Sequence, residues 1–301
     1  MAATRSGKTS EHVVTDVSGV LVGHWTDAVA QTGCTVVLLP HGCVASGEIR
    51  GGSPASREFA LLDPLHKVAS VDAVVLSGGS AFGLAACDGV VDWLAEQGRG
   101  FATAMGPVPI VVGLSLFDLG IGDGSVRPGA MEGRLAAERA VDTNAGIGLI
   151  GAGTGATVGK WFGRDSSEPG GLGAATLRSG DLIVSTLIAV NAFGFIDDGT
   201  TTRDIGAPRF VVDPDNAFGN TTIGVIVTNA RLDKVACHRV AQSGHDGMAR
   251  ALLPAHTDAD GDALVVVATG AVDADIFHLR LLAQHAVTRA IRSVGPVRHH
   301  I

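Results

Sequence analysis

The sequence contains no tyrosine, few other aromatic residues (4% in total) and no closely spaced cysteines. Its four cysteines, Cys34, Cys43, Cys87 and Cys237, form no CxxC pair, which indicates reduced packing residues of a cytosolic protein. Glycine is abundant, with 42 in 301 residues, alongside 46% hydrophobic and 17% charged residues. This composition is typical of a globular protein with many tight turns and close backbone contacts.

An excess of basic residues, a long apolar run and a secretory signal are also missing. The formal net charge is −8 at pH 7, which argues against nucleic acid or an acidic membrane as a partner, because phosphate groups are bound by concentrated Lys and Arg. No apolar run approaches the ~20 residues needed to span a bilayer. The polar residues 1–12 indicate a disordered tail. These absences predict a soluble, cytoplasmic protein.

Three familiar catalytic or metal-binding patterns do not occur. Gly78-Gly79-Ser80-Ala81-Phe82 differs from G-x-S-x-G at its last position, which disfavours an α/β-hydrolase nucleophile. There is no HExxH, and the histidines show no zinc spacing. Asp258-Ala259-Asp260-Gly261-Asp262 resembles a calcium loop, but Thr269 stands where an EF-hand needs glutamate. The sequence predicts no metal site and no cofactor.

The length is enough for one large or two ordinary domains, and no internal repeat or domain boundary is evident. We therefore expect a single domain over residues 13–301. Strand-like and helix-like segments alternate, which favours a layered α+β sandwich. Local patterns predict a strand at 71–76, helices at 231–253 and 275–294, a turn at 23–27, and a hairpin that pairs 34–39 with 44–50.

One stretch calls for a chemical explanation. Gly219-Asn220-Thr221-Thr222 leads into the apolar, β-branched run at residues 223–227, and two hydroxyls are unusual at the start of a buried strand. If the Thr221 hydroxyl attacks the carbonyl of Asn220 and cuts the chain there, the freed α-amine, with a pKa of about 8, can act as the base for its own hydroxyl. Residues 198–216 would be an exposed linker ahead of the cut. The alternative is an ordinary turn before a strand.

Four other polar features have both a structural and a functional explanation, and the sequence does not decide between them. The strand, glycine loop and helix around Ser80 suit an oxyanion site, because the first amides of a helix are unpaired, but they equally suit a plain connection. Lys160 ends a glycine-rich run and is either a surface lysine or a charge delivered to a site. Asn191 interrupts an apolar run, so its amide either satisfies backbone groups or points into a polar pocket. The carboxylates within residues 258–262 form either a solvated turn or a wall that orients an amine.

Three separated motifs together resemble the P1 (DmpA-like) family of self-cleaving aminopeptidases, in particular its nylon-oligomer hydrolase branch with a threonine nucleophile. They are Gly219-Asn220-Thr221-Thr222-Ile223, Val227-Thr228-Asn229 and residues 256–262, and the similarity extends from about Val14 over most of the chain. The resemblance implies an αββα sandwich of the DmpA/ornithine acetyltransferase-like type. It also implies cleavage between Asn220 and Thr221 into a large chain, 1–220, and a small chain, 221–301, and assembly into homo-oligomers such as a tetramer of cleaved protomers.

The resemblance also implies roles for individual residues. Thr221 is similar to the family's nucleophile. Lys160 and Asn191 match polar partners near it. Asp260 and Asp262 match an acidic pair that holds the new amine and tunes its proton.

Ser80, Gly83 and Phe117 are candidates for oxyanion or substrate contacts. Phe117 stands where the family often has a tyrosine, so a phenolic hydroxyl is not expected in the mechanism. The implied substrates are small peptides, amides or esters. Two alternatives stay open: acyl transfer of the ornithine acetyltransferase-like type, and a non-catalytic binding scaffold in which Gly219-Asn220 is only a turn.

Overall fold

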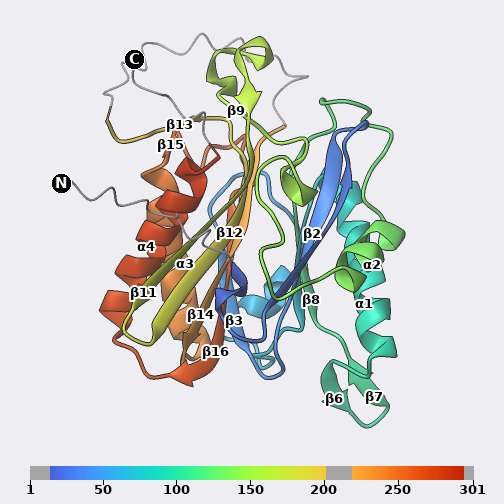
Figure 1. Cartoon of the computed structure of the whole chain (residues 1–301), viewed down its shortest axis with the longest axis vertical. Coiled ribbons are helices and arrows are strands. Elements are labelled where there is room, and N and C mark those ends of the chain that lie inside the picture. Colours follow the sequence, from blue (N-terminus) through green and yellow to red (C-terminus); the bar gives the residue numbers. More distant parts are fainter. Residues whose placement is uncertain (1–13, 201–218, 295–301) are drawn as a thin grey trace, which may run out of the picture.

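The computed structural model describes residues 14–200 and 219–294, which form four stacked layers (Figure 1). Two five-stranded sheets pack face to face in the centre, and a pair of helices covers the outer face of each. This is the αββα sandwich of the α+β class that the sequence predicts. The expected tail at residues 1–12 and residues 201–216 of the expected linker lie outside the described ranges.

The first sheet is antiparallel except for one central parallel pair. In spatial order its strands are β1 (Leu21–Asp27), β2 (Thr32–Leu38), β5 (Ala73–Ser77), β8 (Val111–Ser115) and β4 (Ala55–Arg57), and its helices are α1 (Ala86–Glu96) and α2 (Ala130–Glu138). The parallel pair is β5 and β8, because the chain crosses over through α1 between them. Val36 and Val75 on the outer face pack with Val90 and Leu94 of α1 in one apolar cluster.

The second sheet carries the other helix pair. Its strands are, in spatial order, β11 (Gly171–Ser179), β12 (Leu182–Asn191), β14 (Thr221–Ala230), β16 (Ala263–Val272) and β3 (Val44–Ile49), and its helices are α3 (Lys234–Ala249) and α4 (Ile276–Arg292). Strands β14 and β16 are parallel. Each helix starts after an aspartate whose side chain accepts from a first-turn amide: Asp233 from Ala236 N at 2.7 Å, and Asp275 from His278 N at 2.8 Å.

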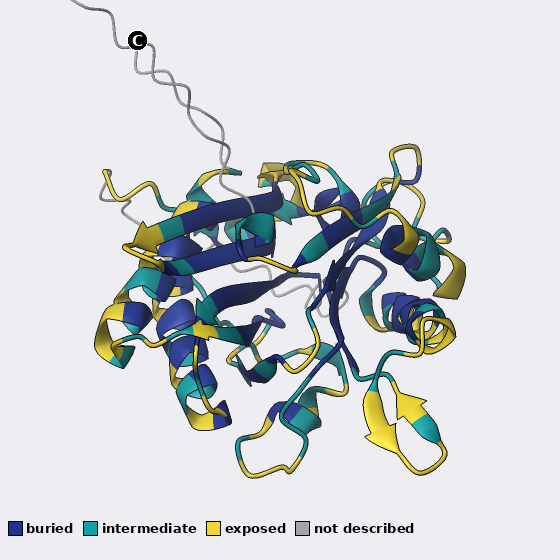
Figure 2. Ribbon diagram, turned by 60° about the horizontal axis from the view of Figure 1, so that its bottom comes forward, coloured by how far each residue is buried: buried dark blue, intermediate teal, exposed yellow. Residues whose placement is uncertain are grey.

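The main core lies between the two sheets, where the strands are buried (Figure 2). Ile223, Val225 and Val227 of β14 belong to this inner core, whereas Ile226 belongs to the cluster under α3 and α4. Because both faces of β14 are covered, its residues 223–227 form an unbroken apolar run instead of an alternating one.

Some locally predicted elements are confirmed, whereas one turn and one strand pairing are wrong. The strand expected at 71–76 and the helices expected at 231–253 and 275–294 are present as β5, α3 and α4. The expected turn at 23–27 lies inside β1, and β3 pairs with β16 of the second sheet instead of with β2. The short connection Pro40-His41-Gly42 therefore joins the two sheets, because burial of apolar faces, and not loop length, chooses the partner strand.

The remaining elements are short. Two-stranded pairs are formed by β6 (Phe101–Thr103) with β7 (Gly106–Val108), β9 (Thr157–Val158) with β10 (Glu168–Pro169), and β13 (Phe195–Ile196) with β15 (Leu252–Leu253). The 3-10 helices are η1 (Val14–Asp16), η2 (Phe59–Leu62), η3 (Ser80–Ala85), η4 (Gly151–Gly153), η5 (Lys160–Phe162) and η6 (Arg164–Ser166). No helix in the described part of the chain combines the length and apolar character that a membrane crossing needs.

The four cysteines are buried and form no disulfide. Burial raises the pKa of the Cys87 and Cys237 thiols to about 12, so these thiols stay protonated and unreactive. The prediction that the cysteines are packing residues is confirmed.

Candidate active site

The predicted site residues meet at one end of the second sheet. Thr221 is the first residue of β14, and the strand register pairs it with Asn191, the last residue of β12. On the other side β14 runs parallel to β16, so the loop that ends at Asp262 arrives beside the same end. The sheet topology therefore gathers three segments that are far apart in the sequence around the start of β14 (Figure 1).

The Thr221 side chain is buried, with 3% of the residue exposed. Its hydroxyl donates a hydrogen bond to the carbonyl oxygen of Asn220, the preceding residue. Gly261 lies directly beside this hydroxyl, since a Cβ atom at Gly261 would stand 2.7 Å from Thr221 Oγ1. Only glycine lets the acidic loop approach the threonine this closely.

Lys160 is buried, with 8% exposed, and not the surface lysine of the alternative explanation. Its ammonium nitrogen donates to Asn191 Oδ1 at 2.9 Å, to Asn191 O at 3.2 Å and to Gly219 O at 3.2 Å. Burial lowers the pKa of Lys160 to about 7, although the negative charge of Asp260 opposes this shift. A lysine with this pKa can release or accept a proton near neutral pH.

The Asn191 side chain uses both ends of its amide. Oδ1 accepts from Lys160 and from Thr157 N at 2.9 Å, while Nδ2 donates to Phe117 O at 3.0 Å and to Gly219 O at 3.4 Å. These donors and acceptors fix the orientation of the amide. The ring of Phe117 also lies against Gly219, because a Cβ atom on that glycine would stand 3.6 Å from Phe117 Cδ1. Phe117 thus borders the chain just before Thr221.

The acidic loop presents two buried carboxylates. Asp260 and Asp262 are each 1% exposed, whereas Asp258 is exposed. Asp260 Oδ1 accepts from Phe193 N at 3.1 Å, and Asp262 Oδ1 accepts from Thr222 N at 2.7 Å. A solvated turn does not describe this loop, since two of its three carboxylates are packed into the site. Asp262 holds the residue that follows the predicted nucleophile.

Asp260 gives the site a measurable pH dependence. Burial, reinforced by the charge of Asp262, raises the pKa of Asp260 from an ordinary 3.8 to about 6. Between these values the folded chain binds more protons than the unfolded chain, so this group lowers the free energy of unfolding as pH rises from about 4 to about 6. Asp260→Asn removes the titration. We expect the stability of the asparagine variant relative to its parent to increase by roughly 2–3 kcal/mol across that window.

Chemical denaturation between about pH 4 and 6 tests this expectation. Both proteins carry Thr221→Ala, so that the predicted cleavage at Thr221 cannot alter either chain. A difference in unfolding free energy that does not change with pH would contradict the raised pKa of Asp260.

The glycine loop around Ser80 and Gly83 connects β5 to α1 through η3. Ser80 N donates to Leu116 O at 2.9 Å and Gly83 N to Gly79 O at 3.4 Å, and Asp118 Oδ1 accepts from Gly79 N at 2.7 Å. Both predicted oxyanion amides therefore have backbone partners. In the part of the chain that the structure describes, no hydrogen bond links Ser80 or Gly83 to the residues around Thr221. Their part in oxyanion binding stays a prediction.

Comparison with known protein families gives a match to peptidase family S58 over residues 12–296. The chain belongs to this family. It is accordingly a hydrolase of amide bonds, and the resemblance to DmpA-like peptidases inferred from the sequence is confirmed.

Relatives of this S58 chain include both aminopeptidases and nylon-oligomer hydrolases. An uncharacterized aminopeptidase of Mycobacterium leprae is 42% identical over 317 residues, which covers 94% of this chain and 85% of the relative. A 6-aminohexanoate-oligomer endohydrolase of Paenarthrobacter ureafaciens is 34% identical over 278 residues, covering 86% of this chain and 75% of the relative.

Solved structures match the fold. A β-aminopeptidase from Burkholderia sp. superposes with a TM-score of 0.72 at 21% identity, covering 94% of this chain and 86% of that one. The L-aminopeptidase D-Ala-esterase/amidase from Ochrobactrum anthropi, described as a variant of the Ntn-hydrolase fold, gives a TM-score of 0.70 at 19% identity and covers 94% and 85%. The S58 chain therefore has an Ntn-hydrolase type of fold.

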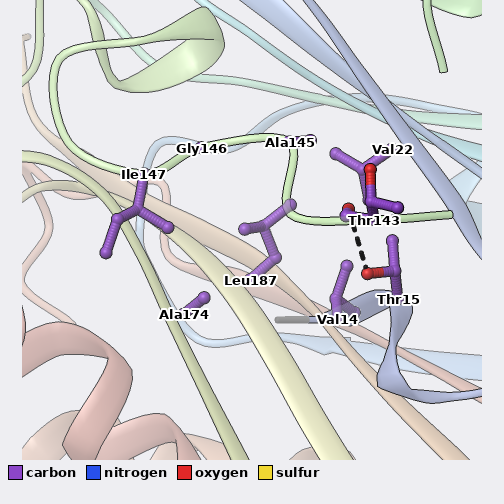
Figure 3. Close-up of a pocket in the computed structure, with 9 residues that line it drawn as sticks. All are labelled: Val14, Thr15, Val22, Thr143, Ala145, Gly146, Ile147, Ala174 and Leu187. Carbon is purple, nitrogen blue, oxygen red and sulfur yellow. Dashed lines mark hydrogen bonds between the residues drawn. The ribbon is translucent and has the colours of Figure 1, made fainter. Parts of the chain in front are cut away.

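Two cavities of the S58 chain are lined by other residues than those around Thr221. A small, mostly apolar one of about 10 Å³ lies between the sheets near η1 (Figure 3), lined by Val14, Thr15, Val22, Thr143, Ala145, Gly146, Ile147, Ala174 and Leu187. A larger one of about 350 Å³ lies beside β3 and η2, lined by Gly47, Glu48, Ile49, Phe59, Ala60, Asp63, Pro64, His66 and His238. Neither cavity holds a predicted site residue.

Three residues beside the site have no role assigned from the sequence. Thr257 Oγ1 donates to Asp260 Oδ2 at 2.5 Å, His256 contacts the other buried carboxylate, and a Cβ atom on Gly219 would stand 2.8 Å from a guanidinium nitrogen of Arg164. The acidic motif contains the first two and could have drawn attention to them. Arg164 carries no sequence signal, because only the fold brings it there. Among the described residues, no three His, Cys, Asp or Glu side chains are grouped to hold a metal ion.

Proposed function

We propose that this S58 chain is a self-processing N-terminal-threonine amide hydrolase with Thr221 as its nucleophile. The observation that carries the proposal is the buried Thr221 hydroxyl in contact with the carbonyl oxygen of Asn220. Lys160, Asn191 and the acidic loop converge on this junction. A hydroxyl next to the carbonyl that it attacks needs little reorganisation, which supports cleavage at this bond.

In self-cleavage, Thr221 Oγ bonds to the carbonyl carbon of Asn220, the C–N bond breaks, and the nitrogen takes a proton and becomes the α-amine of Thr221. Water then hydrolyses the ester, which leaves a carboxylate on Asn220 and restores the hydroxyl. The chains 1–220 and 221–301 stay together after the cut. Strand β14 of the small chain pairs with β12 of the large chain, and β16 pairs with β3.

In turnover, the α-amine of Thr221, with a pKa near 8, takes the hydroxyl proton as Oγ attacks the substrate carbonyl. The proton passes to the leaving amine when the amide C–N bond breaks. Water then releases the acyl group from Oγ. The buried carboxylates of Asp260 and Asp262 hold the α-amine and keep it directed at the hydroxyl.

Lys160 and Asn191 are the proposed oxyanion donors. Lys160 Nζ and Asn191 Nδ2 both donate to one carbonyl oxygen in the uncut chain, that of Gly219, at 3.2 and 3.4 Å. A pair of donors that converges on a carbonyl oxygen suits the negative charge that develops on a reacting carbonyl. Release of the segment that ends at Asn220 would free both donors for a substrate.

The names of the relatives support a small amide as substrate. One relative is called an aminopeptidase and another a 6-aminohexanoate-oligomer endohydrolase. We propose peptides, other small amides or esters as substrates, and a homo-oligomer of cleaved protomers as the active assembly.

Intact-mass spectrometry of freshly purified protein tests self-processing directly. We expect two chains of about 22 and 8 kDa, by proportion of the 30.5 kDa total, with Thr221 as the first residue of the smaller chain. A single full-length mass that persists on incubation, in protein that shows cooperative thermal unfolding, would refute the proposal.

A further inference from the structure

His256 closes the acidic loop on itself. Its backbone N–H and its ring nitrogen Nδ1 both lie 2.9 Å from one oxygen, Oδ2, of Asp262. The other oxygen of the same carboxylate, Oδ1, accepts from Thr222 N at 2.7 Å. The carboxylate therefore links His256 to the residue directly after Thr221.

The imidazole of His256 also contacts His245, on the side away from Asp262. Its Nε2 lies 3.3 Å from the carbonyl oxygen of His245, and the two rings meet edge to face with centroids 4.9 Å apart. His245 is fully buried on α3 and its Nε2 lies 2.9 Å from Glu48 O of β3, so it is itself anchored. Both neighbours of the His256 ring nitrogens are oxygen acceptors.

The backbone of His256 is also unusual. Its φ of 58° lies in the left-handed region, which non-glycine residues seldom adopt and which costs free energy. Asparagine and glycine adopt this conformation more readily than histidine. Histidine is therefore not the residue that the backbone conformation favours at this position. Its ring does, however, contact Asp262, and glycine has no side chain that could make this contact.

We propose that His256 is a positioning residue, which fixes the rotation of the Asp262 carboxylate so that Thr222, and with it the amine and hydroxyl of Thr221, stay aligned for reaction. This inference rests on the proposed function of Thr221. The carboxylate stands between the imidazole and the backbone of β14, so His256 acts through Asp262 and does not touch the reacting atoms.

Two variants distinguish the effect of the ring contact from the effect of the left-handed backbone conformation. His256→Gly and His256→Asn both tolerate the left-handed conformation, but only asparagine keeps an N–H donor where Nδ1 stands. Self-cleavage is followed by mass in a cell-free translation, which needs no substrate. We expect His256→Gly to slow cleavage about 10–100-fold, as loss of a residue that orients a catalytic group does, and His256→Asn to recover most of the rate.

His238→Asn is the control, because His238 is likewise a partly buried histidine whose Nδ1 lies 2.9 Å from an oxygen, the carbonyl of Gly47, but it lies on α3 and does not contact the acidic loop. Its cleavage rate should equal that of the parent chain. Cleavage of His256→Gly at the parent rate, or His256→Asn as slow as His256→Gly, would overturn the positioning role alone. A parent chain that is never cut would refute the proposed function and this inference with it.

Discussion

Thr221→Ala will leave the chain at full length and abolish amide hydrolysis. The substitution removes the hydroxyl that we propose as the nucleophile of both reactions, while the methyl side chain still fits the buried start of β14. We expect no fragments on incubation and a loss in kcat on the order of 10⁴-fold or more, as when a nucleophile is removed. Intact mass and hydrolysis of an aminoacyl p-nitroanilide measure the two effects.

Thr221→Ser is the matched control, since it keeps the hydroxyl and removes only a methyl group. It should be cut at the same bond and retain turnover. If Thr221→Ala stayed uncut but hydrolysed the p-nitroanilide as well as the parent, Thr221 would not be the nucleophile. If it were cut, another group would have to perform the cleavage.

The sequence contained enough information for the fold class and for the buried strand that starts at Thr221. The apolar run after residue 222 predicts a strand that is buried on both faces, and β14 is such a strand. Two hydroxyls at its start had no packing explanation, which is why they pointed to reactivity. Local patterns also located α3 and α4, because hydrophobic periodicity is a local property of the sequence.

What the sequence could not supply was which distant segments meet. The pairing of Asn191 with Thr221, and the parallel alignment of β14 with β16, depend on strand order in the sheet. The same limit explains why the hairpin between β2 and β3 was wrong. The position of Arg164 beside Gly219 and the contact of His256 with His245 could not be predicted either, because both arise from tertiary contacts that the spacing of residues in the sequence does not indicate.

Two buried lysines allow a matched test of whether the ammonium group of Lys160 contributes to catalysis. Lys160 and Lys234 are each 8% exposed, and each ammonium group donates to three oxygens. Burial lowers the pKa of both. The partners differ: Lys160 holds Asn191 and Gly219 beside Thr221, whereas Lys234 holds the backbone of residues 61–68, which contributes nothing to the site.

Methionine replaces either lysine with a side chain of similar length and no donor. Each variant leaves buried oxygens without a partner, so both should lose about 1–3 kcal/mol of unfolding free energy. Only Lys160→Met also removes a proposed oxyanion donor and the hydrogen bond that holds Gly219 O next to the predicted cleavage site. We therefore expect it to slow self-cleavage and to lower kcat, normalised to the cleaved fraction, by about 10²–10³-fold. Lys234→Met should cleave and turn over like the parent.

Equal losses of kcat in both variants would mean that stability alone limits the reaction. A fully active Lys160→Met would remove Lys160 from the mechanism and leave Asn191 Nδ2 as the side-chain donor to the oxyanion.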